Sequence, residues 1–387
     1  MAQTTERSCF EATTFYNKAA HDSLEIATEN HIKYNQQNIA NSRGEITIPV
    51  VVHIVYPTEN ENISDAQVFS QIDALNRDFN RRNNNLDKVH TDFRGRIANV
   101  GFNFCLATID PEGNATNGIT RTATKTDSEF FRGAEWLYYT EKDGKSAWDT
   151  EKYLNIWVTK ISDISQILGY ASKPFESPPE KDGVVIDAKN FGINGTAISP
   201  YDLGRTGTHE VAHYFNISHP FNNGCDGDDF VADVPQQSNS YDGACETGEK
   251  MSCGNRDNVS NFMNYSQDEC LAMFTKGQAL RMQAALIHAR SGLLNNNACQ
   301  QPPTPTLTDE IKIYPNPASY YFCIEVGNSN LVQIPYTIFN AQGAKVEEGL
   351  VLPNSIQHFP TYRNGIYFVQ FMDGSAEGTL KKVVINN

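Results

Sequence analysis

Residues 209–219 read HEVAHYFNISH, and this stretch decides how the middle of the chain is interpreted. Residues four apart lie on one face of a helix, so His209 and His213 can direct imidazole nitrogens at one metal ion. Glu210 lies one step round the helix, where its carboxylate can act as a general base on water. His219 completes a set of three nitrogens only if the helix ends and the chain turns back.

We expect that turn near Asn216, because asparagine accepts the left-handed backbone conformation better than any residue except glycine. Three nitrogens with an open fourth position are typical of catalytic zinc rather than structural zinc. The alternative is that these histidines face solvent, or form ordinary hydrogen bonds, on an amphipathic helix.

The surrounding sequence alternates between strand and helix patterns. Residues 46–56 are rich in β-branched side chains and predict a buried strand. Capping boxes at residues 64–67 and 275–278 open two predicted helices that run to about Phe79 and Leu294. A helix is also expected at 203–215, with strands near 101–109, 153–161 and 183–186. Strands with a long backing helix predict an α/β or α+β domain.

Composition narrows the class of protein. The 387 residues carry 31 basic and 46 acidic side chains, a net charge of −15, which argues against nucleic acid as a partner. Such a balance suits a secreted protein that binds cations or basic substrates. The longest apolar run, at residues 48–56, is too short to span a bilayer, so we expect no transmembrane segment.

The eight cysteines indicate whether the protein folds in an oxidising or a reducing cellular compartment. Cys225, Cys245, Cys253 and Cys270 crowd one loop-rich region without a CxxC pair, which favours two disulfides over a structural zinc site. Residues 1–10 show no secretory leader, so the protein is either intracellular or has lost its leader; the cysteines favour the second reading. The sequence assigns no partners to the three cysteines Cys105, Cys299 and Cys323.

Changes in composition divide the chain into four segments. Residues 1–44 are polar, with a partial helix expected around 12–34, and resemble an appendage to the domain at 45–299. Residues 300–309 form a Pro/Thr linker, which is stiff and extended. Residues 310–387 alternate short strand patterns with turn signals and predict a small all-β sandwich of about 75 residues. Its expected strands lie at 312–314, 321–326, 336–339, 366–371 and 381–385.

Residues 45–295 resemble the pappalysin family of metzincin zinc peptidases. The resemblance rests on the zinc motif together with residues 46–56, 118–121 (GITR), 168–171 (LGYA), 204–206 (GRT), 261–266 (NFMNYS) and 274–278 (FTKGQ). Asn216 and Ala212 stand where the family usually has glycine. The resemblance implies an α+β fold, with a twisted mixed sheet, backing helices and an active-site helix, and a zinc endopeptidase activity.

The resemblance also implies roles for two residues after the zinc motif. Met263 would form an apolar floor beneath the zinc, a role close to that of an ordinary core methionine. The hydroxyl of Tyr265 would face the oxyanion of the tetrahedral intermediate, although without the family Tyr265 would read as a half-buried aromatic side chain.

Residues 226–235 (DGDDFVADVP) are acidic and resemble the family's calcium loop. Asp229 and Asp233 would offer carboxylates and Val231 its carbonyl, which are the hard oxygen ligands that Ca²⁺ prefers. Val234 replaces the usual threonine, so a side-chain ligand is lost there. The alternative is a solvated acidic loop.

The same family pattern suggests disulfides Cys225–Cys253 and Cys245–Cys270. Asp268 and Glu269 follow Tyr265 near the family's S1′ pocket, where a buried acid would favour Arg or Lys on the C-terminal side of the cleaved bond. If these two carboxylates face solvent, no such preference follows.

The N-terminal segment resembles family prosegments through the Arg-x-Cys start at residues 7–9. A Cys9 thiolate could occupy the open zinc position and keep a precursor latent, but Cys9 in a disulfide or as a free thiol is an open alternative. Cleavage between Ser42 and Arg43 would release the segment and match a preference for Arg.

The tail resembles the C-terminal sorting domain of the type IX secretion system of Bacteroidetes-type bacteria, through residues 313–318 (IYPNPA), 365–367 (GIY) and 381–385 (KKVVI). This implies secretion or attachment to the cell surface, and contact with that secretion machinery. The alternative is an accessory β-sandwich that binds carbohydrate or protein. For the whole chain the rival to a peptidase acting on proteins or peptides is a non-catalytic surface adhesin on a peptidase scaffold.

Overall fold

The computed structural model describes residues 15–35, 46–125, 135–161, 167–244, 250–294, 297–299, 311–319, 321–326, 334–351, 356–360, 362–372 and 379–386. The chain divides into two compact units. The first comprises Met1–Glu112 and Gly118–Cys299, and the second comprises Gly113–Asn117 and Gln300–Asn387. Cys9, Ser42, Arg43 and Cys245 lie outside the described residues.

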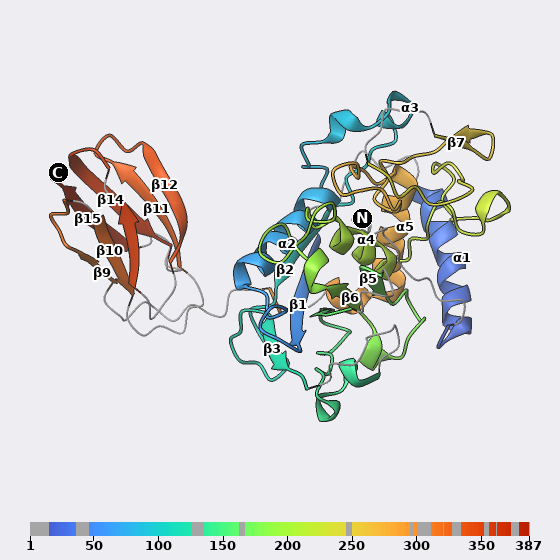
Figure 1. Cartoon of the computed structure of the whole chain (residues 1–387), viewed down its shortest axis with the longest axis horizontal. Coiled ribbons are helices and arrows are strands. Elements are labelled where there is room, and N and C mark those ends of the chain that lie inside the picture. Colours follow the sequence, from blue (N-terminus) through green and yellow to red (C-terminus); the bar gives the residue numbers. More distant parts are fainter. Residues whose placement is uncertain are drawn as a thin grey trace, which may run out of the picture. The chain divides into compact units, whose positions relative to one another are not determined.

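The first unit is built on a six-stranded mixed sheet with the order β2-β1-β4-β6-β5, in which β3 also pairs with β1 (Figure 1). Every pairing is parallel except that of β5 with β6, which is antiparallel. The strands are β1 (Ile46–Tyr56), β2 (Phe102–Leu106), β3 (Ile119–Ala123), β4 (Leu154–Thr159), β5 (Gly169–Ala171) and β6 (Val184–Asp187). The expected mixed sheet and α+β fold are therefore confirmed.

The first strand is the spine of this sheet. Residues 48–55 of β1 are buried throughout, as expected for a run of β-branched side chains covered on both faces. Its first half pairs with β2 and its second half with β3. The sequence analysis did not predict β3 or β5 as strands, because each is a short segment with little apolar alternation.

Helices lie against the sheet and along the edge of the unit. They are α1 (Lys18–Asn35), α2 (Asp65–Phe79), α3 (Thr91–Arg94), α4 (Arg205–Tyr214) and α5 (Lys276–Ala289). A two-residue hairpin is formed by β7 (Met251–Ser252) and β8 (Asn255–Arg256). Helices α2, α4 and α5 contribute to one core with β1, β2 and β4, in which the rings of Phe79, Phe102 and Phe274 meet.

The predicted helix starts are confirmed where capping residues set them. Ser64 accepts a hydrogen bond from the backbone of Gln67 at the start of α2, and Thr275 forms a full capping box with Gln278 at the start of α5. Helix α5 ends at Ala289, earlier than predicted. Gly292 approaches the carbonyl of Glu151 too closely for any side chain, and glycine disfavours a continued helix.

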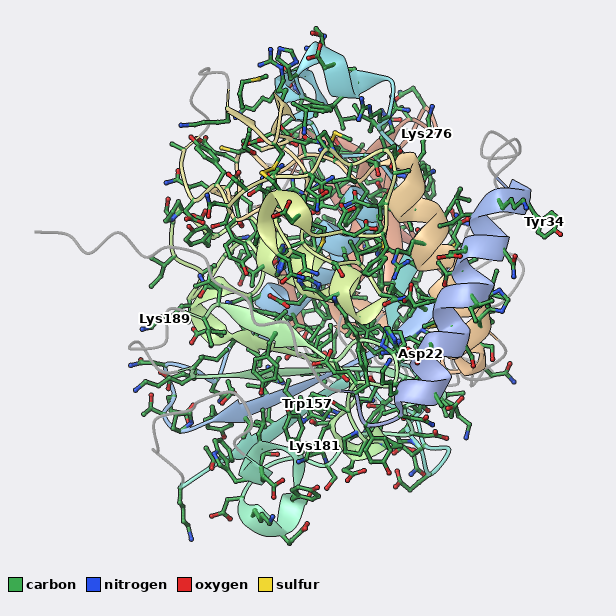
Figure 2. All side chains as sticks on the ribbon, turned by 90° about the vertical axis from the view of Figure 1, so that its right-hand side faces the viewer. Asp22, Tyr34, Trp157, Lys181, Lys189 and Lys276 are labelled. Atoms are coloured by element: carbon green, nitrogen blue, oxygen red, sulfur yellow. A yellow bond between two sulfur atoms is a disulfide. The ribbon has the colours of Figure 1, made fainter. Side chains whose placement is uncertain are left out.

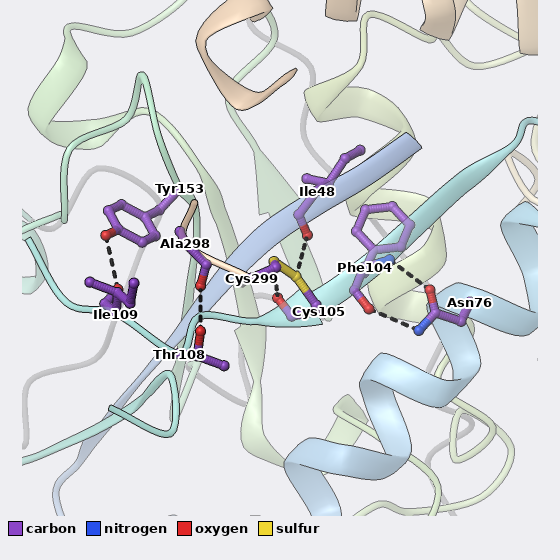
Figure 3. The surroundings of a disulfide bond; sticks show 9 residues. All are labelled: Ile48, Asn76, Phe104, Cys105, Thr108, Ile109, Tyr153, Ala298 and Cys299. Carbon is purple, nitrogen blue, oxygen red and sulfur yellow. Dashed lines mark hydrogen bonds between the residues drawn. A yellow bond between two sulfur atoms is a disulfide. The ribbon is translucent and has the colours of Figure 1, made fainter. Parts of the chain in front are cut away.

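A disulfide between Cys105 and Cys299 fastens the last residues of the first unit beside β2 (Figure 3). Next to it, Thr108 donates through both its backbone and its hydroxyl to the carbonyl of Ala298. The sequence offered no pairing for these cysteines, since 194 residues separate them.

The second unit is a sandwich of two antiparallel sheets, as predicted. One sheet has the order β13-β10-β9 and the other β12-β11-β14-β15. The strands are β9 (Ile311–Tyr314), β10 (Tyr321–Val326), β11 (Ile334–Asn340), β12 (Lys345–Val351), β13 (Ile356–Pro360), β14 (Gly365–Phe371) and β15 (Thr379–Ile385). Strands β12 and β13 were not predicted, and β12 carries three charged residues among its first four. Cys323 is a buried thiol in β10.

In the parts of the chain that the structure describes, no helix combines the length and the apolar character needed to cross a membrane.

Candidate active site

The three histidines of the motif converge on one point. Helix α4 presents His209 and His213 on the same face, and His219 returns from the chain that follows the helix. The Nε2 atoms of the three side chains lie 3.0–3.1 Å from one another, and all three residues are buried. Among the described residues these form the only cluster of three or more metal-ligating side chains.

The turn that makes this possible lies where the sequence predicted it. Helix α4 ends at Tyr214, and Asn216 takes the left-handed conformation with φ 70°. The backbone of Ile217 then donates to the carbonyl of Ala212, which folds the chain back over the helix end. At the other end, α4 begins after Gly204, whose φ of 76° favours glycine.

Backbone carbonyls fix the orientation of two rings. The Nδ1 of His209 donates to the carbonyl of Phe262 at 2.8 Å, and the Nδ1 of His213 donates to the carbonyl of Ile217 at 2.6 Å. In a neutral imidazole this places the lone pair on Nε2. Such lone pairs facing one another repel unless a cation lies between them. Zinc with nitrogen ligands at about 2.0–2.1 Å in a tetrahedron separates them by about 3.3 Å, which the observed spacing approaches.

The environment of His219 keeps it suited to this role. Burial, with smaller contributions from His209 and Lys173, holds the pKa of His219 well below its usual value. The ring also stacks on Phe221, with centroids 4.8 Å apart. A neutral, fixed imidazole is what a metal ligand requires.

Glu210 is buried on α4 next to the first histidine, and it packs against β5. A Cβ atom at Gly169 would lie 2.9 Å from the Cγ of Glu210 and 2.9 Å from the carbonyl oxygen of Val185. Gly169 therefore provides the space that the Glu210 side chain occupies. The sequence analysis quoted this glycine in a motif but assigned it no role, because it did not predict the strand that begins at Gly169; a glycine in a strand is a sign of close approach by another element.

Tyr265 and Met263 lie in the segment whose Phe262 carbonyl accepts the hydrogen bond from His209. The ring of Tyr265 lies 5.1 Å from that of His219 and 5.8 Å from that of His209. Met263 is fully buried in the main core, next to the residue whose carbonyl binds His209. The structure thus brings the predicted tyrosine to the histidines and the methionine into the core beside them.

The acidic loop holds Asp229, Val231 and Asp233 in different roles. One carboxylate oxygen of Asp229 accepts from the backbone of Val231, and its Oδ2 is buried without a hydrogen-bond partner. Burial raises the pKa of Asp229 to about 7. Asp233 instead accepts from the Thr275 hydroxyl and the Gly277 backbone at the start of α5. Asp229 therefore has a buried carboxylate oxygen that could bind a cation, while Asp233 caps the start of α5.

Asp268 and Glu269 are placed very differently. The Oδ2 of buried Asp268 accepts from the backbones of Leu203 and Arg205, which fixes the entry to α4. The Glu269 carboxylate is 56% exposed and lies 3.8 Å from the Nζ of Lys88. The two neighbours therefore do not form a shared acidic pocket.

A disulfide joins Cys225 to Cys253, the pair that the family pattern suggests. Cys270 is also disulfide-bonded, but its suggested partner, Cys245, lies outside the described residues. Cys9 lies outside them too, so its suggested contact with the zinc site stays a prediction.

Comparison with known proteins gives matches to both units of the chain. The family model for pregnancy-associated plasma protein-A matches residues 138–287, and that for a secretion system C-terminal sorting domain matches residues 312–386. Mature mirolysin of Tannerella forsythia, solved with a cleaved peptide, is 40% identical; the match covers 66% of this chain and 100% of mirolysin, with a TM-score of 0.61.

The chain belongs to the pappalysin family.

Two curated relatives of this pappalysin come from fungi. An extracellular metalloprotease of Arthroderma gypseum is 29% identical, over 72% of this chain and 83% of the relative. Extracellular metalloprotease 1 of Coccidioides posadasii is 37% identical, over 36% of this chain and 51% of the relative, so the pappalysin described here spans only about half of that protein's length.

The pappalysin is accordingly a zinc metallopeptidase with a secretion sorting domain at its C-terminal end. A further match, a promirolysin variant of Tannerella forsythia, is 39% identical with a TM-score of 0.61; it covers 74% of this chain and 95% of the promirolysin chain.

Proposed function

We propose that this protein is a secreted zinc endopeptidase in which Glu210 is the general base. The observation that carries the proposal is the convergence of three buried Nε2 atoms at 3.0–3.1 Å beside a buried glutamate on the same helix. His209, His213 and His219 would hold the zinc ion. When bound, zinc would supply a Lewis acid that polarises the scissile carbonyl and acidifies water.

The protein's own side chains then handle the proton. The Glu210 carboxylate accepts a proton from the attacking water and delivers it to the departing amine nitrogen. Its position on the turn of α4 next to His209 supports this, as does the space left by Gly169. Burial and the packing against β5 restrict the carboxylate to few orientations, which suits a base that must meet one water.

Tyr265 is proposed to stabilise the oxyanion. Its ring packs edge-on against His219 and Phe221 and lies 5.8 Å from the ring of His209, which supports a place for the phenol beside the histidines. A hydroxyl that donates to the developing negative charge stabilises the transition state more than the ground state. Met263 would provide the apolar support beneath the ligands.

We propose a preference for Arg or Lys at P1′ that depends on Asp268 more than on Glu269. Asp268 is buried three residues after Tyr265, and two backbone N–H groups hold its carboxylate in place. Glu269 is exposed beside Lys88, which favours the solvent-facing alternative for that residue.

A calcium ion is proposed at Asp229, with the carbonyl of Val231 and the carboxylate of Asp233 as further ligands. The buried Oδ2 of Asp229 and the raised pKa of its carboxyl support a cation here. The hydrogen bonds that Asp233 accepts from α5 would have to be shared with the ion.

Residues 1–44 are proposed to be a prosegment that keeps the precursor latent, with Cys9 as a zinc ligand. The longer match to promirolysin, over 74% of the chain against 66% for mature mirolysin, supports this. The sorting domain, at 310–387 beyond the linker 300–309, would engage a type IX secretion machinery of a Bacteroidetes-type bacterium.

The test compares the wild type with Glu210→Ala on a denatured protein mixture, with zinc content measured for both. We expect cleavage before basic residues by the wild type, and one bound zinc without cleavage for the variant. Glu59→Ala, on the loop after β1, is a matched control that should keep full activity. If neither protein cleaves, even after residues 1–42 are removed, the adhesin alternative replaces the peptidase.

A further inference from the structure

Helix α1 of the N-terminal segment lies along α5 on the surface of the first unit (Figures 1 and 2). Leu24 and Thr28 are buried in this contact, while Tyr34 near the end of the helix is exposed. The helix is anchored at its start as well, because the backbones of Tyr16 and Asn17 donate to the carbonyls of Glu176 and Phe175.

One carboxylate of α1 reaches the elements of the active site. Both oxygens of Glu25 lie 2.7 Å from the Nη2 of Arg281 on α5, and its Oε1 also accepts from the Nδ2 of Asn216 at 2.9 Å. The Nε of Arg281 donates to the backbone carbonyl of the same Asn216 at 2.8 Å. Arg281 and Asn216 thus surround a single carboxylate with donors.

The charges of this contact are largely withdrawn from water. The Arg281 side chain is 3% exposed and that of Glu25 is 22% exposed. Although burial raises the pKa of Glu25, the charge of Arg281 and the hydrogen bonds from Asn216 and Arg281 outweigh it, so the pKa lies below its usual value. A buried guanidinium without its carboxylate is costly, so this part of the catalytic unit favours an anion in this place.

Asn216 links this contact to the metal ligands. It is the left-handed residue on which the chain turns between His213 and His219. A second connection runs parallel to it: the Nζ of buried Lys173 donates to the hydroxyl of Ser218, and Lys173 lies in the segment on which the start of α1 rests. The docked helix α1 therefore contacts Asn216 directly and Ser218 through Lys173, the two residues that flank Ile217 in the turn.

We propose that Arg281 and Asn216 form a carboxylate-binding site on the catalytic unit, and that Glu25 occupies it in the precursor and holds the turn before His219 in place. The inference rests on the proposed prosegment role of residues 1–44. Once that segment leaves, the site is open to another carboxylate, such as an acidic side chain of a partner or a small organic acid.

The test uses the full chain with Glu210→Ala, so that no self-cleavage occurs and the result does not depend on peptidase activity. Hydrogen exchange is compared for this protein, for the added substitution Glu25→Gln, and for the matched control Glu29→Gln one turn further along α1. We expect Glu25→Gln to speed exchange in residues 18–35 and 214–218 by about tenfold or more, and Glu29→Gln to leave both unchanged. Unchanged exchange in residues 214–218 would overturn the proposal.

Two further measurements separate a carboxylate site from a general loosening. Glu25→Gln should also lose zinc to a chelator severalfold faster than Glu29→Gln, because the turn before His219 is less restrained. In Glu25→Ala, which empties the site, acetate should slow exchange at 214–218 again, whereas chloride at equal ionic strength should not. Equal effects of acetate and chloride would overturn the assignment of the site to carboxylates.

Discussion

The Nδ1 of His209 lies 2.8 Å from the carbonyl oxygen of Phe262, which joins helix α4 to a segment 53 residues further along the chain. The hydrogen bond fixes the tautomer and the rotation of the first histidine of the motif. Because Phe262 directly precedes Met263, the packing of that methionine and the orientation of His209 are parts of one arrangement. The active-site helix alone could not provide it.

Gly169→Ala should lower the peptidase activity. The new methyl group would meet Glu210 and the carbonyl of Val185 at 2.9 Å, so the base must shift. Displacement of a catalytic group by a fraction of an ångström to 1 Å lowers kcat by up to about 10²-fold. Peptide hydrolysis measured beside Gly95→Ala, where a Cβ meets nothing within 4 Å, provides the comparison. Activity of Gly169→Ala within twofold of the wild type would show that the glycine has no such role.

Asp229→Asn should change stability in opposite directions with and without calcium. In calcium-depleted buffer at pH 8 the variant should melt higher, because burial raises the pKa of Asp229 to about 7 and makes its ionised form unfavourable. Calcium that binds only the folded wild type raises its free energy of unfolding, by about 2.7 kcal/mol when the calcium concentration is about 100 times Kd. The variant should gain little. Thermal melting with a calcium titration measures both, and equal calcium responses would exclude Asp229 as a ligand.

Docking of α1 should weaken as the pH falls below about 6.5. Burial lowers the pKa of His21, whose neighbours are Glu25 and Asp22 on its own helix and Arg281 and Lys173 on the catalytic unit. The undocked histidine therefore binds more protons, so docking is strongest above the ordinary histidine pKa and is lost as the pH falls below it.

Hydrogen exchange of residues 18–35 at pH 5 and pH 7.5, corrected for intrinsic rates and carried out with Glu210→Ala, measures this effect. His21→Phe keeps an aromatic ring against Phe15 and should remove most of the pH dependence. An undiminished pH dependence in that variant would assign it to other groups.

Removing Cys105–Cys299 should destabilise the first unit more than removing Cys225–Cys253. The two disulfides span 194 and 28 residues. For loops of these lengths, the lost entropy of the unfolded chain is expected to stabilise the folded state by about 5 and about 3.5 kcal/mol. All three tryptophans, Trp136, Trp148 and Trp157, belong to this unit, so their fluorescence in urea follows its unfolding alone. A larger loss for Cys225/Cys253→Ser would contradict the prediction.

Several elements were predictable because their signals are local. The β-branched run of β1, the caps at Ser64 and Thr275, and the left-handed Asn216 each follow from the chemistry of a few neighbouring residues. The spacing of the histidines in the zinc motif is of the same kind, since helix geometry relates residues four apart.

Other features were missed because their cause lies elsewhere in the chain. Strand β5 is three residues long and exists through its pairing with β6, and the space at Gly169 matters only because α4 packs against it. The pairing of Cys105 with Cys299 and the capping of α5 by Asp233 likewise join residues far apart in sequence. The expectation of an acidic pair at Asp268 and Glu269 treated neighbours as equivalent, whereas folding buries one and exposes the other.

The sequence by itself determined the spacing of the three histidines, the place of Glu210 beside the first of them, the turn that returns His219, and the motifs of a peptidase and a sorting domain. These depend on residue type and short-range spacing. Only the tertiary structure decided what orients the histidines, what makes room for Glu210 and what binds Glu25. Those contacts connect α1, α4, β5, α5 and the segment around Phe262, and their energy comes from burial that exists only when the distant segments pack together.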